Sequence, residues 1–428
     1  MQHIIQNNKR KNERKNEMEI KTKYQYTYFI YPYTVNEKKF DKYLSKLLHN
    51  KNCKLKIFEK EKDWDLYTYF LPKVRDFMFW SFEFSKNRIK NLDELDNSMK
   101  ATLLSKKPCT IFEYKIDKDI QGKAGKRDGI FFNIRKIEII CFNTGICFLS
   151  IKTTLDEGST ISDVCNFNYK FRDINSSLSK LKDFENIKIQ TDAFKDIKGI
   201  GALIKDITGS NIGARELNID TERFITYSYL CIGQEDWNEK SNEELLEKEF
   251  YKFANIEPAN YIVDSNSSME AYKIQKSKYV KYGCTNTATV LLTSDINTEN
   301  YTKLPHQYEN QYLYNYIFEL YKKIYLKKIN KEFGITNKFG ITRQKFIDFT
   351  QSIWIEEVSN DEIGSELTQQ WKSILSTDRI YAQVKQKYDT IYKNVNIEKT
   401  AKSNKWIAII LVILVIVNII NCINIMGR

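Results

Sequence analysis

The sequence predicts an α+β cytosolic domain with a mixed sheet and flanking helices, then a long α-helical stalk and one C-terminal transmembrane helix. Three observations lead to this prediction. Residues 136–142 and 146–153 are β-rich runs around the turn Asn-Thr-Gly at 143–145, the pattern of a β-hairpin. Apolar residues at helical spacing dominate after Pro305. Residues 406–426 carry no charge and are long enough to cross a bilayer.

Composition excludes several classes of protein. The chain has 428 residues, 42% of them hydrophobic and 14% aromatic, which is enough to bury a core and excludes a disordered chain. Its formal net charge is +12, but basic residues are concentrated in segments 1–18 and 372–405. The body between these segments is nearly neutral, whereas nucleic-acid-binding domains concentrate Lys and Arg on their surface. We therefore expect no direct nucleic-acid partner.

Residues 19–300 are predicted to form the α/β cytosolic domain, after a disordered basic tail at 1–18. The aromatic and β-branched run at 24–35 predicts a strand that stops at Pro32. Either Ser159 or Ser162 is expected to cap a helix that continues through Tyr169. Further elements are expected as a helix at 40–48, strands at 223–232 and 287–293, and a helix at 242–253.

Residues 301–405 are predicted to form a helical layer and a stalk. Helical spacing from Tyr308 to Ile324 is followed by expected helices at 345–358 and 366–375. In the stalk, apolar side chains recur every three or four positions, at Ile380, Val384, Tyr388, Ile391 and Val395. Such a stripe leading into a membrane indicates a stalk packed against a copy of itself. The alternative is a stripe folded back on the body of its own chain.

Residues 406–426 are predicted to span the membrane. Twenty-one helical residues extend about 31 Å, close to the roughly 30 Å thickness of the hydrocarbon core. Lys402, Lys405 and Trp406 are expected at the membrane interface. More lysines precede the span than basic residues follow it, so the positive-inside rule places the N-terminal body in the cytoplasm. This predicts a single-pass protein with the lipid bilayer as a partner.

Three asparagines, Asn418, Asn421 and Asn424, recur at intervals of three within the span. At 100° per residue they lie within an arc of about 120°. Amides facing lipid are unfavourable, so this face is expected to meet water or another helix. This face has three possible interpretations. It lines a pore or an oligomer interface, it packs against another helix without a pore, or its asparagines have no role.

The sequence contains no catalytic motif, so we expect no enzyme. Phosphate-binding loops, nucleophile elbows and zinc motifs are absent, and eight scattered cysteines are expected to be reduced, buried thiols. Two weaker ligand-binding candidates remain. Asn168, Lys170 and Arg172 are able to stack on a base and pair with phosphate, with an ordinary helix end as the alternative. Lys126 and Arg127 lie in a glycine-containing loop that is a candidate for an anion.

An acidic cluster near the start of the stalk is the metal candidate. Glu357, Asp361 and Glu362 are close in sequence, and carboxylates at this density are able to hold Mg²⁺ through water. The alternative is a solvated helix face. Mg²⁺ is therefore the one cofactor to consider.

Several local patterns carry a family resemblance. They are IYPYTV at 30–35, FNTGICFLSIK at 142–152, FITYSYLCI at 224–232 and QYLYNYIFELYKKIYL at 311–326, in a chain with a C-terminal membrane helix. This layout resembles the CorA-type magnesium transporters, and more closely their divergent CorA-like relatives found beside bacterial defence genes, including CRISPR systems. The family has two membrane helices and a Gly-Met-Asn motif. Here only one span is found, and residues 425–428 read Ile-Met-Gly-Arg instead.

The resemblance implies a homo-oligomeric effector in the bacterial inner membrane, with a pentamer as the candidate assembly. Its cytosolic domain would sense a signal in antiviral defence, and its C-terminal helices would form or perturb a pore. A nucleotide second messenger is the signal that the defence-associated relatives suggest. The alternatives are a divalent-cation transporter for Mg²⁺ and a non-conducting, tail-anchored scaffold.

Overall fold

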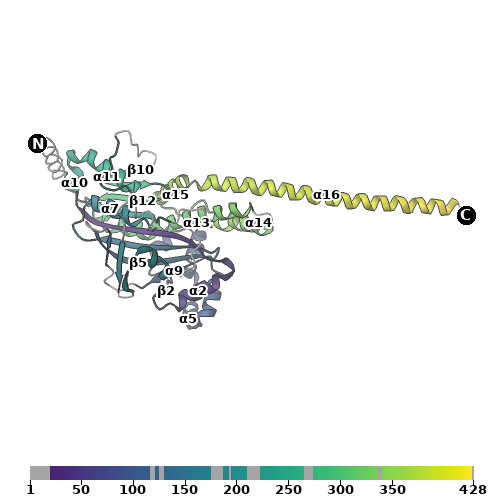
Figure 1. Cartoon of the computed structure of the whole chain (residues 1–428), viewed down its shortest axis with the longest axis horizontal. Helices are drawn as coiled ribbons and strands as arrows, with labels where there is room; N and C mark the ends of the chain where they lie inside the picture. The colour runs from purple at the N-terminus through teal and green to yellow at the C-terminus, as the bar shows by residue number, and fades with distance from the viewer. Residues whose placement is uncertain are drawn as a thin grey trace.

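The computed structural model describes residues 20–115, 121–124, 130–174, 187–191, 194–209, 222–264, 273–334 and 339–426. A twisted sheet lies between helices on its two faces, and one long helix, α16, extends away from this body (Figure 1). The strands are β1 (Thr22–Thr34), β2 (Cys53–Leu55), β3 (Cys109–Tyr114), β4 (Gln121–Ala124), β5 (Ile130–Phe142), β6 (Ile146–Leu155), β7 (Ile187–Thr191), β8 (Phe194–Lys198), β9 (Ile225–Ile232), β10 (Lys273–Ser277), β11 (Val280–Cys284) and β12 (Ala288–Ser294). The helices are α2 (Phe40–His49), α3 (Trp64–Tyr69), α4 (Pro72–Met78), α5 (Lys86–Glu94), α6 (Asn97–Leu104), α7 (Ile161–Phe171), α9 (Ile200–Thr208), α10 (Gln234–Asn238), α11 (Glu243–Asn255), α12 (Lys303–Gln307), α13 (Leu313–Glu332), α14 (Phe339–Asp348), α15 (Glu362–Leu375) and α16 (Thr377–Met426).

The predicted mixed sheet with flanking helices is confirmed. The described strands run in the order β10-β11-β12-β9-β1-β6-β5-β4-β7-β8, with β3 also paired to β5 and β2 paired to β3. Strands β12 and β9 are parallel, and every other described pair is antiparallel. The predicted hairpin is β5 and β6, and its turn uses Gly145 at φ +77°. A Cβ there would collide with the carbonyl oxygen of Val35, so the turn requires glycine.

The expectation that the first strand stops at Pro32 is wrong, because β1 continues to Thr34. Strand β9 pairs with β1 only as far as Ile30, whereas β6 pairs with it through Thr34. Pro32 therefore lies where one side of β1 has no neighbouring strand. A proline has no N–H to donate, and such a half-paired position tolerates it.

Alternating side chains of β1 enter two different cores. Tyr26, Tyr28 and Ile30 pack with the helices from α12 to α16, together with α3 and α4. Phe29 and Tyr31 pack on the opposite face with α2, α7, α9 and α11. Both faces of the sheet are thus covered, which explains why its central strands read as almost continuous apolar runs.

Helix α7 begins differently from the prediction. Its N-cap is Thr160, not Ser159 or Ser162. The Thr160 hydroxyl accepts from the backbone N–H of Asp163, and the Asp163 carboxylate accepts from the N–H of Thr160. This reciprocal capping box satisfies two backbone donors at once.

The helical layer lies against the sheet face that carries Tyr26 and Tyr28. A π-helical turn, Tyr308–Tyr312, leads into α13, whose side chains are buried on several sides. Helix α14 begins at Phe339, and its π-helical continuation ends at Ile353, so the helix expected at 345–358 starts earlier and ends earlier. Trp371 of α15 donates to Thr289 Oγ1 of β12 at 3.2 Å and ties the layer to the sheet.

The stalk stripe packs on the body of its own chain. Val384 is fully buried, Ile380 is 9% exposed, and both belong to the core shared with α13 and the sheet. Tyr388 and Ile391 pack against the same core and are partly buried. The alternative interpretation, a stripe folded back on the body of its own chain, is therefore confirmed at Ile380 and Val384, which are covered within the chain. The side chain of Val395 lies outside the described part.

Candidate functional site

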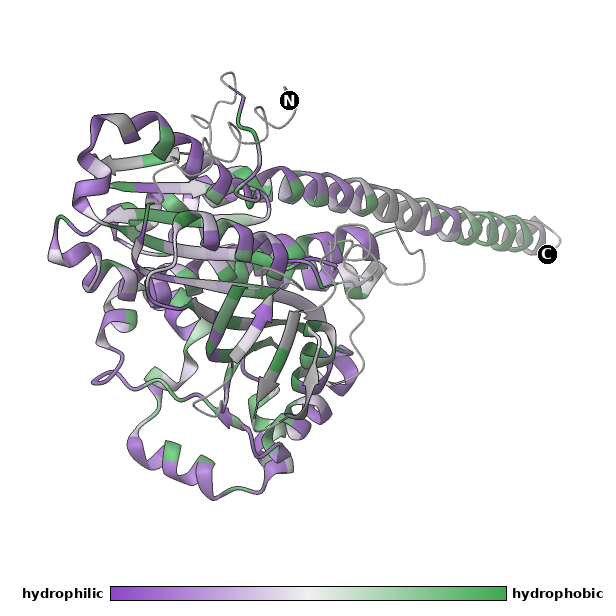
Figure 2. Cartoon of the chain, turned by 60° about the vertical axis from the view of Figure 1, so that its left-hand side comes forward, coloured by the Kyte–Doolittle hydropathy of each residue, from purple (hydrophilic) through white to green (hydrophobic). Residues whose placement is uncertain are grey.

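The C-terminal half of α16 is the first candidate site. The described chain contains one helix long and apolar enough to cross a membrane, over Thr400–Ile420, and none of that span is buried. Figure 2 shows this end of α16 as a hydrophobic rod beyond the hydrophilic surface of the body. Lys402 and Lys405 are exposed, and Trp406 is 67% exposed. Asn418 is exposed as well, while the side chains of Asn421 and Asn424 lie outside the described part.

The predicted ligand-binding residues of α7 do not converge on a site. Asn168 is 1% exposed, and its Oδ1 accepts from Thr27 Oγ1 at 3.0 Å, so it holds the helix to the sheet. The Arg172 guanidinium lies 4.9 Å from the ring of Tyr169. Burial, followed by the nearby Arg223, lowers the pKa of Arg172. Lys170 is partly exposed. Asn168 is thus a packing residue that a ligand does not reach.

The other residues predicted from the sequence are the two cations of the glycine-containing loop and the acidic cluster before the stalk. Lys126 and Arg127 lie outside the described residues. Asp361 caps α15 by accepting from the N–H of Gly364 at 2.7 Å, while Glu357 and Glu362 are exposed. In the described part of the chain, no group of three or more His, Cys, Asp and Glu side chains is placed to hold a metal ion.

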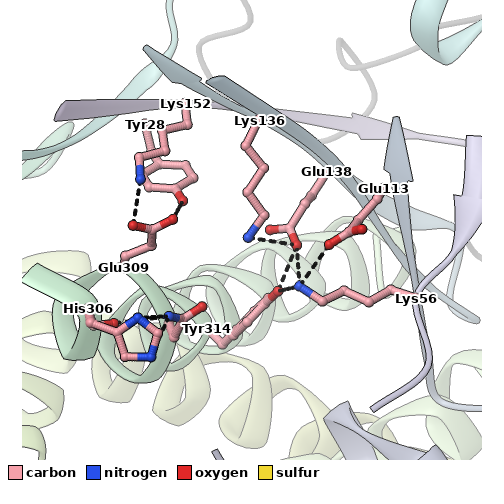
Figure 3. Close-up of polar contacts among 10 residues, drawn as sticks. Tyr28, Lys56, Glu113, Lys136, Glu138, Lys152, His306, Glu309 and Tyr314 are labelled. Atoms are coloured by element: carbon pink, nitrogen blue, oxygen red, sulfur yellow. Dashed lines mark hydrogen bonds and ion pairs between the residues drawn. The ribbon is translucent and has the colours of Figure 1, made fainter. Parts of the chain in front are cut away.

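A buried polar cluster between the sheet and α13 was not predicted from the sequence (Figure 3). At its centre is Glu138 of β5, whose side chain is 1% exposed. Its Oε1 atom accepts from Lys56 Nζ at 2.8 Å and from the Tyr314 hydroxyl at 2.9 Å. Lys136 Nζ lies 3.2 Å from the same oxygen, and Glu113 lies 3.3 Å from Lys56. Glu138 Oε2 is buried and accepts no hydrogen bond from the described residues.

The charges of this cluster hold one another ionised. Burial alone would raise the pKa of Glu138, but Lys136 and Lys56 outweigh it and bring that pKa to about 2. Burial also opposes the charge of Lys56, yet Tyr314 and Glu138 together keep the pKa of Lys56 above its usual value. The cluster therefore joins β5, the segment after β2 and α13 through charge-assisted hydrogen bonds.

A second contact joins the sheet to the beginning of the helical layer. Lys152 Nζ of β6 lies 2.5 Å from Glu309 Oε2, on the π-helical turn before α13. The Tyr28 hydroxyl of β1 donates to Glu309 Oε1 at 2.8 Å. The Lys152 and Glu309 side chains are 12% and 18% exposed, so solvent reaches this pair from one side.

That open side is a basic cleft of about 720 Å³. Lys152 and Glu309 form part of its wall, and the walls carry six basic but only two acidic side chains. The cleft is lined by β5, β6, the chain at β2 and β3, and Glu309 of the helical layer. The basic residues that line it are Lys51, Lys54, Lys115, Arg135, Lys136 and Lys152, and the acidic ones are Glu113 and Glu309. Its chemistry favours an anion.

The sequence did contain one signal for this cleft. Lys136 and Glu138 stand at alternate positions in the second half of strand β5, where all the other residues are apolar, on the face that the helices cover. Charges buried in a strand require partners, so such residues point to a polar cluster. The partners themselves come from segments as far as 176 residues away, as with Tyr314, and no local pattern reveals them.

Comparison with known proteins does not assign this chain to a family. No protein-family model, no curated protein and no solved structure matches it.

Proposed function

We propose that this protein is a membrane-anchored effector whose cytosolic body senses a signal and whose C-terminal helices, brought together in several copies, form or perturb a pore. One observation carries the proposal. Helix α16 is continuous from Thr377 to Met426, so the core of the body and the apolar segment belong to one helix. Val384 is packed in the core, whereas Thr400–Ile420 has no covering protein. A shift of α13 against α16 would thus reach the membrane directly.

The exposed apolar end supports the anchor. Ile407, Leu411 and Ile416 are each more than half exposed, as are most of their neighbours. A continuous apolar surface of this kind is unfavourable in water and is stabilised by lipid. The lysines before Trp406 favour a body on the cytoplasmic side. The membrane proposed is the inner membrane of a bacterium, which follows the CorA-like resemblance.

The pore proposal depends on the asparagine face of the anchor. One span per chain does not enclose a channel, so several copies are needed, and polar amides on one face would then line it. We expect replacement of Asn418, Asn421 and Asn424 by Leu to abolish ion flux through reconstituted liposomes while membrane insertion is retained. The matched control replaces Ile416, Ile419 and Ile423 by Leu on the opposite face, and should leave flux unchanged. Equal flux in both triple variants would refute the pore.

One observation favours a second function, a non-conducting anchored scaffold. The stripe that would have supported self-association is folded on its own body, at Ile380 and Val384. A scaffold would bind a partner and would show no flux, even as an oligomer. A Mg²⁺ transporter would instead require Mg²⁺-dependent flux. These outcomes separate the three functions.

A further inference from the structure

Two like charges face each other in the basic cleft without a carboxylate between them. Lys136 of β5 and Lys152 of β6 are direct partners in the antiparallel register. Like charges in this arrangement destabilise a sheet unless an anion is close. Each lysine has its own carboxylate, Glu138 for Lys136 and Glu309 for Lys152. The protein therefore already supplies one anion to each member of the pair.

Beyond these two pairs, the cleft holds an excess of positive charge. Lys51, Lys54 and Lys115 form no ion pair with any described residue and are exposed. Arg135 is exposed, and its Nε donates to Thr154 Oγ1 at 3.0 Å, a neutral partner. These four cations make no ion pair with a described carboxylate, although Glu113, the cross-strand partner of Lys54, lines the same cleft and lies 3.3 Å from Lys56. A ligand that neutralises them needs more than one negative charge.

Lys152 is the residue through which a bound ligand would affect the contact between the sheet and the helical layer. It lines this cleft and also the adjoining hollow around Tyr24 and Asp156, together with Arg135. Burial lowers the pKa of Lys152, and the charges of Lys136 and Arg135 add to that effect against the opposing charge of Glu309. An additional anion beside Lys152 would relieve this crowding.

The position of the cleft excludes the headgroups of the anchoring membrane. Helices α13 and α16 run in the same direction, since Asp378 lies close enough to Lys322 to affect its pKa, and further along both helices Lys387 Nζ contacts the carbonyl of Asn330 near the end of α13. From Glu309 to Asn330 is about 30 Å along the helix, and from Lys387 to Trp406 about 28 Å more. A ligand in the cleft is therefore soluble.

We propose that the basic cleft binds a soluble small molecule carrying at least two phosphate groups, and that this ligand competes with Glu309 for Lys152. Phosphate oxygens match the cations in charge and in hydrogen-bonding capacity. The volume of about 720 Å³ accommodates a small molecule and not a macromolecule. Competition follows because Glu309 already neutralises Lys152 and lines the same cleft, so an anion that enters the cleft meets both side chains.

The test is calorimetric titration of the full-length protein in detergent with inorganic tripolyphosphate. We expect saturable binding with one site per chain, and much weaker binding of orthophosphate at equal ionic strength. The variant Lys54→Glu with Arg135→Glu should bind at least about thirtyfold more weakly, because two cations that face the ligand are replaced by carboxylates that repel it. The control pair Lys90→Glu with Lys106→Glu, which makes the same charge change outside the cleft, should bind like the wild type.

A separate variant tests whether the ligand competes with Glu309 for Lys152. Glu309→Gln keeps an oxygen for the Tyr28 hydroxyl but removes the internal anion, so tripolyphosphate should bind roughly three to tenfold more tightly. Absence of saturable binding, equal loss in the control pair, or binding only with anionic lipid vesicles would overturn the site. Unchanged or weaker affinity in Glu309→Gln would overturn the competition.

The binding site does not depend on the pore, but its consequence does. If the proposed function holds, tripolyphosphate should change ion flux in liposomes through Glu309 and α13. Binding without any change in flux would leave the site intact and count against the proposed coupling. Ion flux through liposomes without binding of tripolyphosphate would count against the site and leave the proposed pore intact. The failure of the site and the failure of the proposed function are therefore distinguishable.

Discussion

Lys152 of β6 and Glu309 of the turn before α13 form an ion pair at 2.5 Å, although 157 residues separate them in the chain. This contact joins the centre of the sheet to the first turn of the helical layer. The same layer packs against α16, so the pair lies at one end of a packed path and the apolar end of α16, long enough to cross a membrane, lies at the other. It is one of several contacts that hold the layer to the sheet, together with the Glu138 cluster and the Trp371 hydrogen bond.

We expect the Lys152 and Glu309 pair to contribute measurable coupling to stability. In a double-mutant cycle with Lys152→Met and Glu309→Gln, the coupling free energy should be about 1–2 kcal/mol, because both side chains are largely shielded from water. Denaturant unfolding of the full chain in detergent measures it. The exposed pair of Lys62 and Glu59 is the control and should give a much smaller coupling, because solvent screens it. Equal coupling for the two pairs would contradict the structural role.

The attachment of α16 to the body is tested at Val384. Val384→Asp places a charge at a fully buried position and should lower the free energy of unfolding by more than about 3 kcal/mol, or release α16 from α13. Gln383→Asp introduces the same side chain at the neighbouring exposed position and should change it by less than about 0.5 kcal/mol. Hydrogen exchange of α16 reports the release. Similar exchange in both variants would show that the stripe does not hold the helix.

The Glu138 cluster predicts acid sensitivity. The pKa of Glu138 is about 2 in the folded chain against an unperturbed value of 4.5, so its stabilisation is complete above about pH 4.5. The unfolded chain takes up the proton first as the pH falls, and this stabilisation is lost progressively toward pH 2. Melting temperature should therefore fall over this range.

In Glu138→Gln the fall in melting temperature over the same pH range should be smaller, since the titrating group is absent. That variant should also be less stable at pH 7, because Lys56 and Lys136 lose their shared carboxylate. An unchanged pH dependence in Glu138→Gln would show that other carboxylates dominate acid unfolding.

The start of α7 gives a local prediction. Thr160→Ala removes one half of the capping box and should cost about 1 kcal/mol of stability. Ser162→Ala, two residues further on, should be close to neutral because Ser162 is not the cap. A larger loss for Ser162 than for Thr160 in thermal unfolding would contradict the assignment.

The sequence predicted those helices and strands that are determined by residues close together in the chain. The hairpin at 143–145 follows from two β-rich runs and a glycine that the turn requires, and α11 follows from apolar spacing. The α7 cap was misplaced because three hydroxyl residues occur within four positions. Only the spacing of Thr160 and Asp163, the capping-box pattern, distinguishes them.

The candidate site could not be predicted from local sequence patterns, because contacts between distant segments form it. Lys152 and Glu309 contact each other only because β6 and the helical layer pack face to face. Asn168 looked like a ligand residue by type, yet the fold turns it toward Thr27 in the core. The stalk stripe had the right period for self-association, but periodicity does not say which surface covers it. Tertiary packing decided all three cases.

The measurement that tests the account most directly is the oligomeric mass of the full-length protein in detergent, combined with ion flux from liposomes with and without tripolyphosphate. The account predicts a closed assembly of several copies that conducts ions, and a change in flux when tripolyphosphate is added. A monomer, or an assembly that never conducts under either condition, would contradict it and would identify the protein as an anchored scaffold.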